Sequence, residues 1–178
     1  IDIGAYESQV VKPFFSAIES TNVSCFGAAD GVIACNGGGG SGTLSYSIDG
    51  VYFTSNTVFS GLDVGSYNLS VKDINDCMVT SQIEIEQPTE LILGTTSDNI
   101  SCNGANDGSI IVTASGSSGV YQYQINSETF QASGNFTGLG AGDYIITVRD
   151  QGTPSCMVST DTISITEPLE ILTSITTA

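Results

Sequence analysis

The chain has 178 residues and a mass of 18.4 kDa, and its 40% hydrophobic content is enough to build a core in one large domain or two small ones. Nineteen acidic residues against three basic ones give a formal net charge of -16, which repels nucleic-acid phosphates and anionic lipid. With no histidine and no tryptophan, the chain lacks the usual general base, the commonest zinc ligand and the best aromatic platform for sugar rings. Nucleic-acid partners and most hydrolase or metalloenzyme mechanisms are therefore not expected.

The surface composition is typical of an extracellular protein. Charged residues total only 12% while the mean hydropathy is +0.17, because Ser, Thr, Asn and Gly occupy positions where a cytosolic protein would carry Lys and Glu. No run of residues approaches the roughly 18 apolar residues of a membrane span, so no membrane insertion is expected.

An internal repeat organises the chain. A shift of 77 residues aligns Cys25–Gly31 with Cys102–Gly108, and the register holds without a gap to Asp73 and Asp150, with 19 of 49 paired positions identical, which indicates a duplicated fold unit. Beyond that point the second copy has two extra residues before Cys156 and one more after it. The predicted organisation is residues 1–12 as the end of a preceding domain and a linker, 13–89 and 90–169 as two repeats, and 170–178 as the start of a third.

Each copy is predicted to be all-β. Thr, Val, Ile, Tyr and Phe alternate with small polar residues, most clearly in Tyr67–Val71 and Tyr144–Val148, and again in Ile83–Ile85 and Ile163–Ile165. Gly and Asp-Gly turns separate the runs into about seven short strands per copy. This pattern predicts two tandem immunoglobulin-like β-sandwich modules of about 75–80 residues each.

A tyrosine follows a glycine turn at the start of the strongest strand in each copy. Tyr67 and Tyr144 are these residues, and their position predicts the tyrosine corner of such sandwiches, in which the phenol bonds back to the preceding loop. An ordinary core tyrosine is the alternative, and neither reading implies catalysis.

Four of the five cysteines fall at matched positions, Cys25 with Cys102 and Cys77 with Cys156. The simplest assignment is one disulfide within each copy, Cys25 to Cys77 and Cys102 to Cys156, each worth roughly 4 kcal/mol as an upper figure in the chain-entropy model. A shared metal site is disfavoured because no CxxC spacing is present. Cys35 aligns with Val112 in an apolar strand and is interpreted as a small buried hydrophobe.

No cofactor is expected apart from calcium. Asp30 and Asp107, each followed by Gly, could ligate calcium with loop carbonyls, and so could the cluster of Asp73 and Asp76 with Asp150 near the domain ends. The alternative is that these carboxylates belong to ordinary turns, because the chain has no DxDxDG spacing.

Several of these segments together resemble a known family. Ile100–Ile110 (ISCNGANDGSI), then Gly138–Tyr144 (GLGAGDY), then a cysteine ahead of Ile-x-Ile-x-Glu-Pro, are similar to the SprB-type repeat of giant surface adhesins in gliding Bacteroidota. The resemblance spans residues 14–169, and the first copy departs from it at Phe26, Ala29 and Cys35. The head of the chain, residues 1–7, resembles the closing strand of a parallel β-helix domain. The resemblance also implies type IX secretion and an O-glycan on Thr162 within Asp-Thr-Ile.

The sequence is therefore interpreted as two stalk modules of a long secreted fibre at the cell surface, with a role in adhesion or gliding and no enzymatic activity. The expected partners are neighbouring repeats of the same chain, together with surface polysaccharide or other fibre subunits. One alternative is a glycan-binding module that displays Phe26, Tyr52 and Phe53. Another is an accessory domain of a secreted enzyme.

Overall fold

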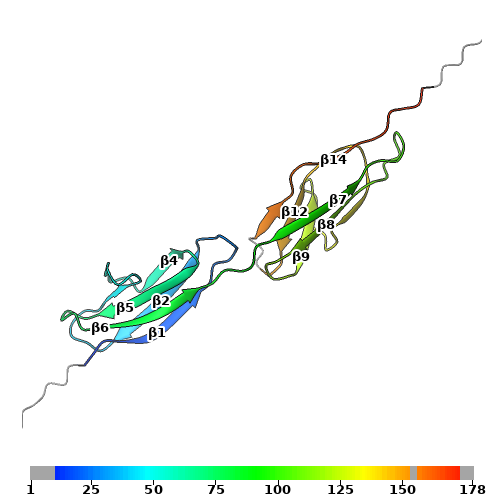
Figure 1. Ribbon diagram of the computed structural model, residues 1–178. Helices are drawn as coiled ribbons and strands as arrows, with labels where there is room; N and C mark the ends of the chain where they lie inside the picture. Colours follow the sequence, from blue (N-terminus) through cyan, green and yellow to red (C-terminus); the bar gives the residue numbers. More distant parts are fainter. Residues whose placement is uncertain (1–10, 153–155, 173–178) are drawn as a thin grey trace, which may run out of the picture. The chain divides into compact units, whose positions relative to one another are not determined.

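The computed structural model describes residues 11–152 and 156–172 of the chain. It divides into two compact units, with the division between Gln87 and Pro88, two residues before the boundary expected from the repeat. All regular structure in the described residues is β-strand, which confirms the predicted fold class of two tandem immunoglobulin-like sandwiches (Figure 1). In the same residues no helix is long and apolar enough to cross a membrane. The predicted β-helix remnant in residues 1–7 lies outside the described residues, as do residues 173–178 of the expected third repeat.

The first unit packs two three-stranded antiparallel sheets against each other. One sheet has the order β1-β2-β4 and the other the order β3-β5-β6. The strands are β1 (Phe14–Thr21), β2 (Gly31–Gly38), β3 (Ser45–Ser47), β4 (Val58–Leu62), β5 (Gly65–Lys72) and β6 (Met78–Ile85). The last two strands pair over their whole length, from Gly65 opposite Ile85 to Lys72 opposite Met78.

The second unit repeats this arrangement, with each of its last two strands divided in two. Its sheets have the orders β10-β8-β7 and β13-β12-β9, with an additional pair β11-β14. The strands are β7 (Ile92–Asp98), β8 (Gly108–Ser115), β9 (Tyr121–Ile125), β10 (Asn135–Leu139), β11 (Gly142–Tyr144), β12 (Ile146–Asp150), β13 (Met157–Ser159) and β14 (Ile163–Ile165). Thus β11 with β12 corresponds to β5, and β13 with β14 corresponds to β6.

The extra residue after Cys156 explains why these strands are split. Tyr144 pairs with Ile163 and Thr147 pairs with Ser159, so the strand after Cys156 carries one more residue than its partner between these pairs. The excess forms a β-bulge, in which the Thr160 hydroxyl accepts the Ile146 N–H at 3.1 Å. The sequence predicted one continuous strand over Tyr144–Val148, and the bulge interrupts it at Ile145.

Each unit has its own core, built from matched residues between its two sheets. Ile33 and Ile110 are fully buried, as are Val71 and Val148. The remaining core residues in the two units are Val23, Cys35, Tyr46, Leu62, Leu69, Ile85, Ile100, Val112, Tyr123, Ile125, Phe136, Ile146 and Ile165. Complete burial of an Ile or Val side chain contributes about 1.5–3 kcal/mol, so these positions account for much of the stability of each unit.

The repeated Asp-Gly pair has a role that the sequence did not predict. Gly31 is the first residue of β2 rather than part of a turn, and an added Cβ there would lie 2.8 Å from the Ile85 Cγ2 atom and 2.9 Å from the Leu62 carbonyl oxygen. Gly108 meets Ile165 at the same 2.8 Å distance. Glycine is therefore required at both positions because the two sheets approach closely there.

Candidate functional site

The chain enters each sandwich at one end of the strands and leaves at the other. In the first unit, β1 begins at Phe14 opposite Gly38, whereas β6 finishes at Ile85, next to Gly31 at the start of β2. We call the end of a unit where its first strand begins the proximal end and the opposite one the distal end. In the second unit, β7 begins at the proximal end and Ile165 of β14 lies beside Gly108 at the distal end. Within each unit, therefore, the first strand begins at the proximal end and the last strand finishes at the distal end.

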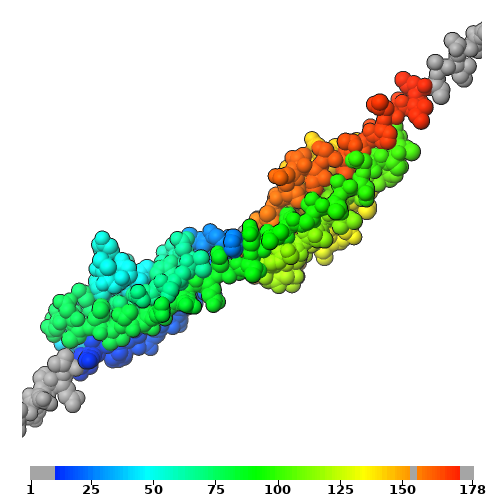
Figure 2. Space-filling model, viewed as in Figure 1, coloured from blue at the N-terminus to red at the C-terminus, as the bar shows by residue number. Residues whose placement is uncertain are grey.

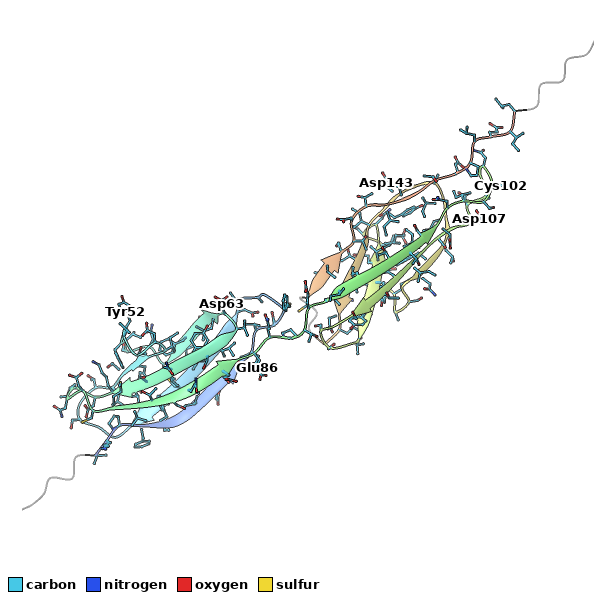
Figure 3. All side chains as sticks on the ribbon, in the orientation of Figure 1. Tyr52, Asp63, Glu86, Cys102, Asp107 and Asp143 are labelled. Carbon is cyan, nitrogen blue, oxygen red and sulfur yellow. The ribbon has the colours of Figure 1, made fainter. Side chains whose placement is uncertain are left out.

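Each distal loop is closed by the aspartate that precedes the strand glycine. The Asp30 carboxylate accepts the Ser24 N–H at 2.9 Å, and Asp107 accepts the Ser101 N–H at 2.9 Å and the Ser101 hydroxyl at 2.5 Å (Figure 3). Hydrogen bonds from the serine side chain and N–H hold the pKa of both carboxyl groups below the usual value. Both aspartates are therefore ionised at neutral pH and complete the loop structure.

A second pair of aspartates closes the proximal loops. The Asp73 carboxylate accepts the N–H groups of Ser41 at 2.9 Å, Asn75 at 2.9 Å and Cys77 at 3.0 Å. The Ser41 bond is the main cause of its lowered pKa, against the opposing effect of burial. This carboxylate thus ties the loop after β2 to the turn between β5 and β6.

Asp150 occupies the equivalent place in the second unit and is completely buried. It accepts the Ser118 N–H at 2.5 Å, the Ser118 hydroxyl, and the Gly152 N–H at 2.8 Å. Burial alone would raise the pKa of Asp150, but the hydrogen bonds from Ser117, Ser118 and Gly152 outweigh it and hold the pKa far below the usual value.

The predicted calcium ligands Asp30, Asp73, Asp107 and Asp150 are therefore not brought together. Asp30 and Asp73 lie at opposite ends of the first unit, as do Asp107 and Asp150 in the second, and each carboxylate is used by neighbouring N–H groups. Among the described residues no group of three or more His, Cys, Asp or Glu side chains could hold a metal ion. Of the two alternatives that the sequence left open at these positions, calcium ligands or ordinary turns, these hydrogen bonds favour the turns.

The predicted disulfides within each unit are wrong. Cys77 and Cys102 have free thiols, whereas Cys25 and Cys156 are disulfide-bonded. The reason is geometric: Cys25 follows Val23, whose N–H donates to the Glu86 carbonyl at the distal end, while Cys77 precedes β6 at the proximal end. The eight residues of β6 separate them by roughly 26 Å, far beyond the Cα distance of about 7 Å that a disulfide spans.

The two matched cysteines of the second unit also lie at opposite ends of its strands. Cys102 lies in the distal loop, where the Gly104 N–H donates to the Glu167 carboxylate at 2.9 Å (Figure 3). Cys156 lies at the proximal end, where its carbonyl accepts the Asp150 N–H at 3.1 Å. Cys35 is buried with 2% of its surface exposed, and burial raises the pKa of its thiol, which agrees with its interpretation as a small core residue.

The two tyrosine corners are confirmed. The Tyr67 hydroxyl donates to the Asp63 carbonyl at 2.9 Å, and the Tyr144 hydroxyl donates to the Gly140 carbonyl at 3.0 Å. Each bond fixes the glycine turn that leads into the long strand of its unit. The tyrosine corners are structural features and do not position a reactive group.

The aromatic residues considered for glycan binding do not gather. Phe53 is half-buried with the Lys72 ammonium 4.5 Å from its ring centre, and in the second unit Arg149 lies 4.0 Å from Phe130 in the same way. Tyr52 is 80% exposed and projects from the loop around residue 50, which stands out from the first unit (Figures 2 and 3). Phe26 is 51% exposed in the distal loop.

The fold defines the class of protein as tandem immunoglobulin-like modules. In each module, aspartates close the loops at the two ends of the sandwich. Residues 94–130, from within β7 to the loop before β10, match the SprB repeat family, so this part of the second unit is similar to an SprB-type repeat. This family is one of structural repeats of cell-surface proteins and is not an enzyme family. No curated protein matches the chain.

Proposed function

We propose that the two units are stalk modules of a long secreted fibre at the cell surface, and that they carry tension during surface adhesion or gliding. The proposal is supported by the SprB-type repeat in residues 94–130 and by the closely similar sandwich in the first unit. The expected partners are neighbouring repeats of the same chain, with surface polysaccharide or other fibre subunits beyond them. The acidic surface favours solubility of such a fibre and disfavours anionic ligands.

The observation that carries the proposal is the polarity of each unit. A force applied through the chain pulls β1 towards the proximal end and β6 towards the distal end, along the strand direction. Antiparallel ladder hydrogen bonds lie perpendicular to the strands, so this force loads the whole β1–β2 ladder, from Phe14–Gly38 to Thr21–Val32, at once. A unit loaded in this way resists extension until several hydrogen bonds break together.

Labelling of intact cells tests the location and form of the fibre. Antibodies against the two units should bind the organism that encodes the chain without permeabilisation, and immunogold label should follow extended filaments outside the cell. Label confined to the cytoplasm, or to compact particles at the cell surface, would contradict the proposal.

Glycan binding is the second candidate function, and one observation favours it. The Asp49 carboxylate accepts the N–H groups of Val51 at 2.8 Å and Tyr52 at 2.9 Å, so the exposed Tyr52 ring is carried on an ordered loop. The aligned residue of the second unit is Thr129, so the two units do not share an exposed aromatic ring at this position. A glycan array with the full chain should be blank under the stalk proposal. Retention that Tyr52→Ala abolishes and Phe26→Ala preserves would favour glycan binding instead.

We also propose that Thr162 carries an O-linked glycan after export by the type IX system. Thr162 and Asp161 are both exposed in the bulge between β13 and β14, so the Thr162 hydroxyl is accessible for modification. The mass of the protein isolated from its native source should exceed the sequence mass, and Thr162→Ala should remove the excess. A native mass equal to that of the unmodified polypeptide would contradict this modification.

No cofactor is proposed for either unit. Asp30, Asp73, Asp107 and Asp150 each already accept hydrogen bonds from neighbouring N–H groups. Millimolar calcium should therefore leave the Tm of the chain unchanged relative to a chelator-treated sample. A calcium-dependent rise in Tm that Asp73→Asn removes would contradict this part of the proposal.

A further inference from the structure

The chain that leaves each unit is held by the loop that joins the first two strands of the same unit. This distal loop covers residues 22–30 in the first unit and 99–107 in the second, and it begins where the first strand ends. The last strand of each unit also finishes at the distal end, at Ile85 or Ile165, beside the glycine that follows the loop. The residues after the last strand, here called the exit residues, therefore lie next to the distal loop of their own unit.

The exit residues of the first unit are Glu86 and Gln87, at the end of β6 (Figure 3). The Glu86 N–H donates to the Asn22 side-chain oxygen at 2.9 Å, and the Asn22 amide donates to the Glu86 carboxylate at 3.3 Å. The Val23 N–H donates to the Glu86 carbonyl at 3.1 Å. The Gly27 N–H donates to the Gln87 side-chain oxygen at 3.0 Å. These four hydrogen bonds tie the exit residues to the distal loop.

The second unit holds its exit residues in the same way. The Thr166 N–H donates to the Asn99 side-chain oxygen at 2.9 Å, and the Ile100 N–H donates to the Thr166 carbonyl at 3.0 Å. Asn99 and Ile100 are the counterparts of Asn22 and Val23 in the repeat. Val23 and Ile100 are also buried, with 4% of each residue exposed, so this attachment is anchored in the core of each unit.

A glycine in each distal loop provides a second point of attachment. The Gly104 N–H donates to the Glu167 carboxylate at 2.9 Å, which corresponds to the bond from Gly27 to Gln87. Each glycine is the third residue of a turn closed by a hydrogen bond from the following alanine to the preceding cysteine, and its φ is +72° in Gly27 and +76° in Gly104. A positive φ at this position is typical of a type II turn, which requires glycine. The glycine is therefore needed for the turn whose N–H holds the exit residue.

We infer that these hydrogen bonds form a load-bearing strap, which joins the first strand of a unit directly to the chain that leaves it. In the first unit, β1 runs from the proximal to the distal end, and Val23, two residues after β1, is bonded to Glu86, the residue after β6. Tension along the chain passes from β1 to the exit residues across the strap, and the chain between Val23 and Glu86 cannot lengthen until the strap opens. The hydrogen bonds do not depend on the proposed function, whereas their load-bearing role rests on it.

Hydrogen exchange of the folded full chain, measured by NMR, tests whether the exit side chain holds the loop. Gln87→Ala should speed exchange of the Gly27 amide by roughly fivefold, since one hydrogen bond is lost. Gln87→Glu should keep the native rate, because the second unit uses a glutamate at this position. The Gly104 amide should be unchanged in both variants and serves as the internal reference. A native exchange rate for Gly27 in Gln87→Ala would overturn the strap.

Stretching of the full chain at constant force, under reducing conditions, tests the load-bearing role. Gln87→Ala should shorten the lifetime of one of the two folded units by roughly fivefold, since the lost bond has to break before that unit extends. Tyr67→Phe is the matched control, because it removes one hydrogen bond from the same unit outside the strap. This control should leave both lifetimes within about twofold of the native values. Glu167→Ala should shorten the lifetime of the other unit.

The outcomes of the stretching experiment separate the strap from the proposed function. Stepwise extension in which Gln87→Ala leaves both lifetimes unchanged, or shortens them no more than Tyr67→Phe does, would contradict the strap alone. Gradual extension of the native chain without steps would contradict both the strap and the proposal that the units carry tension.

Discussion

Replacement of Asp150 by asparagine tests the role assigned to the buried aspartate at the proximal end of the second unit. The carboxylate is completely buried and accepts hydrogen bonds from Ser118 and Gly152. A hydrogen bond to a charged group contributes about 1.5–3 kcal/mol to the unfolding free energy. Asparagine keeps one acceptor oxygen, but its amide NH2 group replaces the second oxygen and faces a backbone N–H, which is also a donor. Asp150→Asn should therefore lower the unfolding free energy of the second unit by roughly 2–4 kcal/mol.

The pH dependence of this loss has a defined sign. The pKa of Asp150 is lower in the folded unit than in the unfolded chain, where it is about 3.9. The stabilisation by the carboxylate is therefore complete above about pH 5 and is lost as the pH falls through the unfolded pKa towards the folded pKa. The difference between the native chain and Asp150→Asn should be constant from pH 5 to pH 8 and should shrink below pH 4.

Urea denaturation followed by tyrosine fluorescence, with hydrogen exchange of the β9–β12 amides, measures this loss in the second unit. Asp161→Asn is the matched control, because it removes one negative charge from an exposed position of the same unit. Equal unfolding free energies for the two variants, or a difference that does not change below pH 4, would refute the role assigned to Asp150.

Two further predictions concern the tyrosine corners and the separate cores. Tyr67→Phe and Tyr144→Phe should each cost about 1 kcal/mol in the urea-derived unfolding free energy of their own unit, since each removes one hydroxyl-to-carbonyl hydrogen bond; no loss in either variant would show that the corners are unimportant. Ile33→Ala and Ile110→Ala each empty a fully buried site and should cost about 2–5 kcal/mol. Hydrogen exchange should show that each isoleucine variant weakens its own unit and spares the other, and equal weakening of both units would contradict two separate cores.

The fold could be predicted from the sequence because the repeat supplied the same information twice. Matched residues such as Ile33 with Ile110 share a side-chain type and a buried position, so their common pattern identified the core. The glycine turn before Tyr67 likewise predicted the corner, because its geometry depends on residues close together in the chain. The single extra residue after Cys156 was visible in the sequence, but only the pairing registers show that it becomes a bulge at Thr160.

The loop chemistry could not be predicted in the same way. The pairing of matched cysteines within a unit was the simplest assignment, and it is wrong because sequence spacing does not show which end of a sandwich a loop occupies. Asp73 and Asp150 were considered as calcium ligands, yet their carboxylate oxygens accept hydrogen bonds from N–H groups of loops about 30 residues away in the chain. The signal that could have identified these loop-closing aspartates was their exact recurrence in the two copies.

Single-molecule stretching of the full chain through its ends, under reducing conditions, tests most directly whether these units bear tension. Reduction makes the result independent of how the cysteines pair. The account predicts two separate unfolding peaks, one per unit, each of which releases roughly 230–270 Å of chain at about 3.6 Å per residue. Gradual extension without distinct peaks, or a single event that releases both units together, would contradict it.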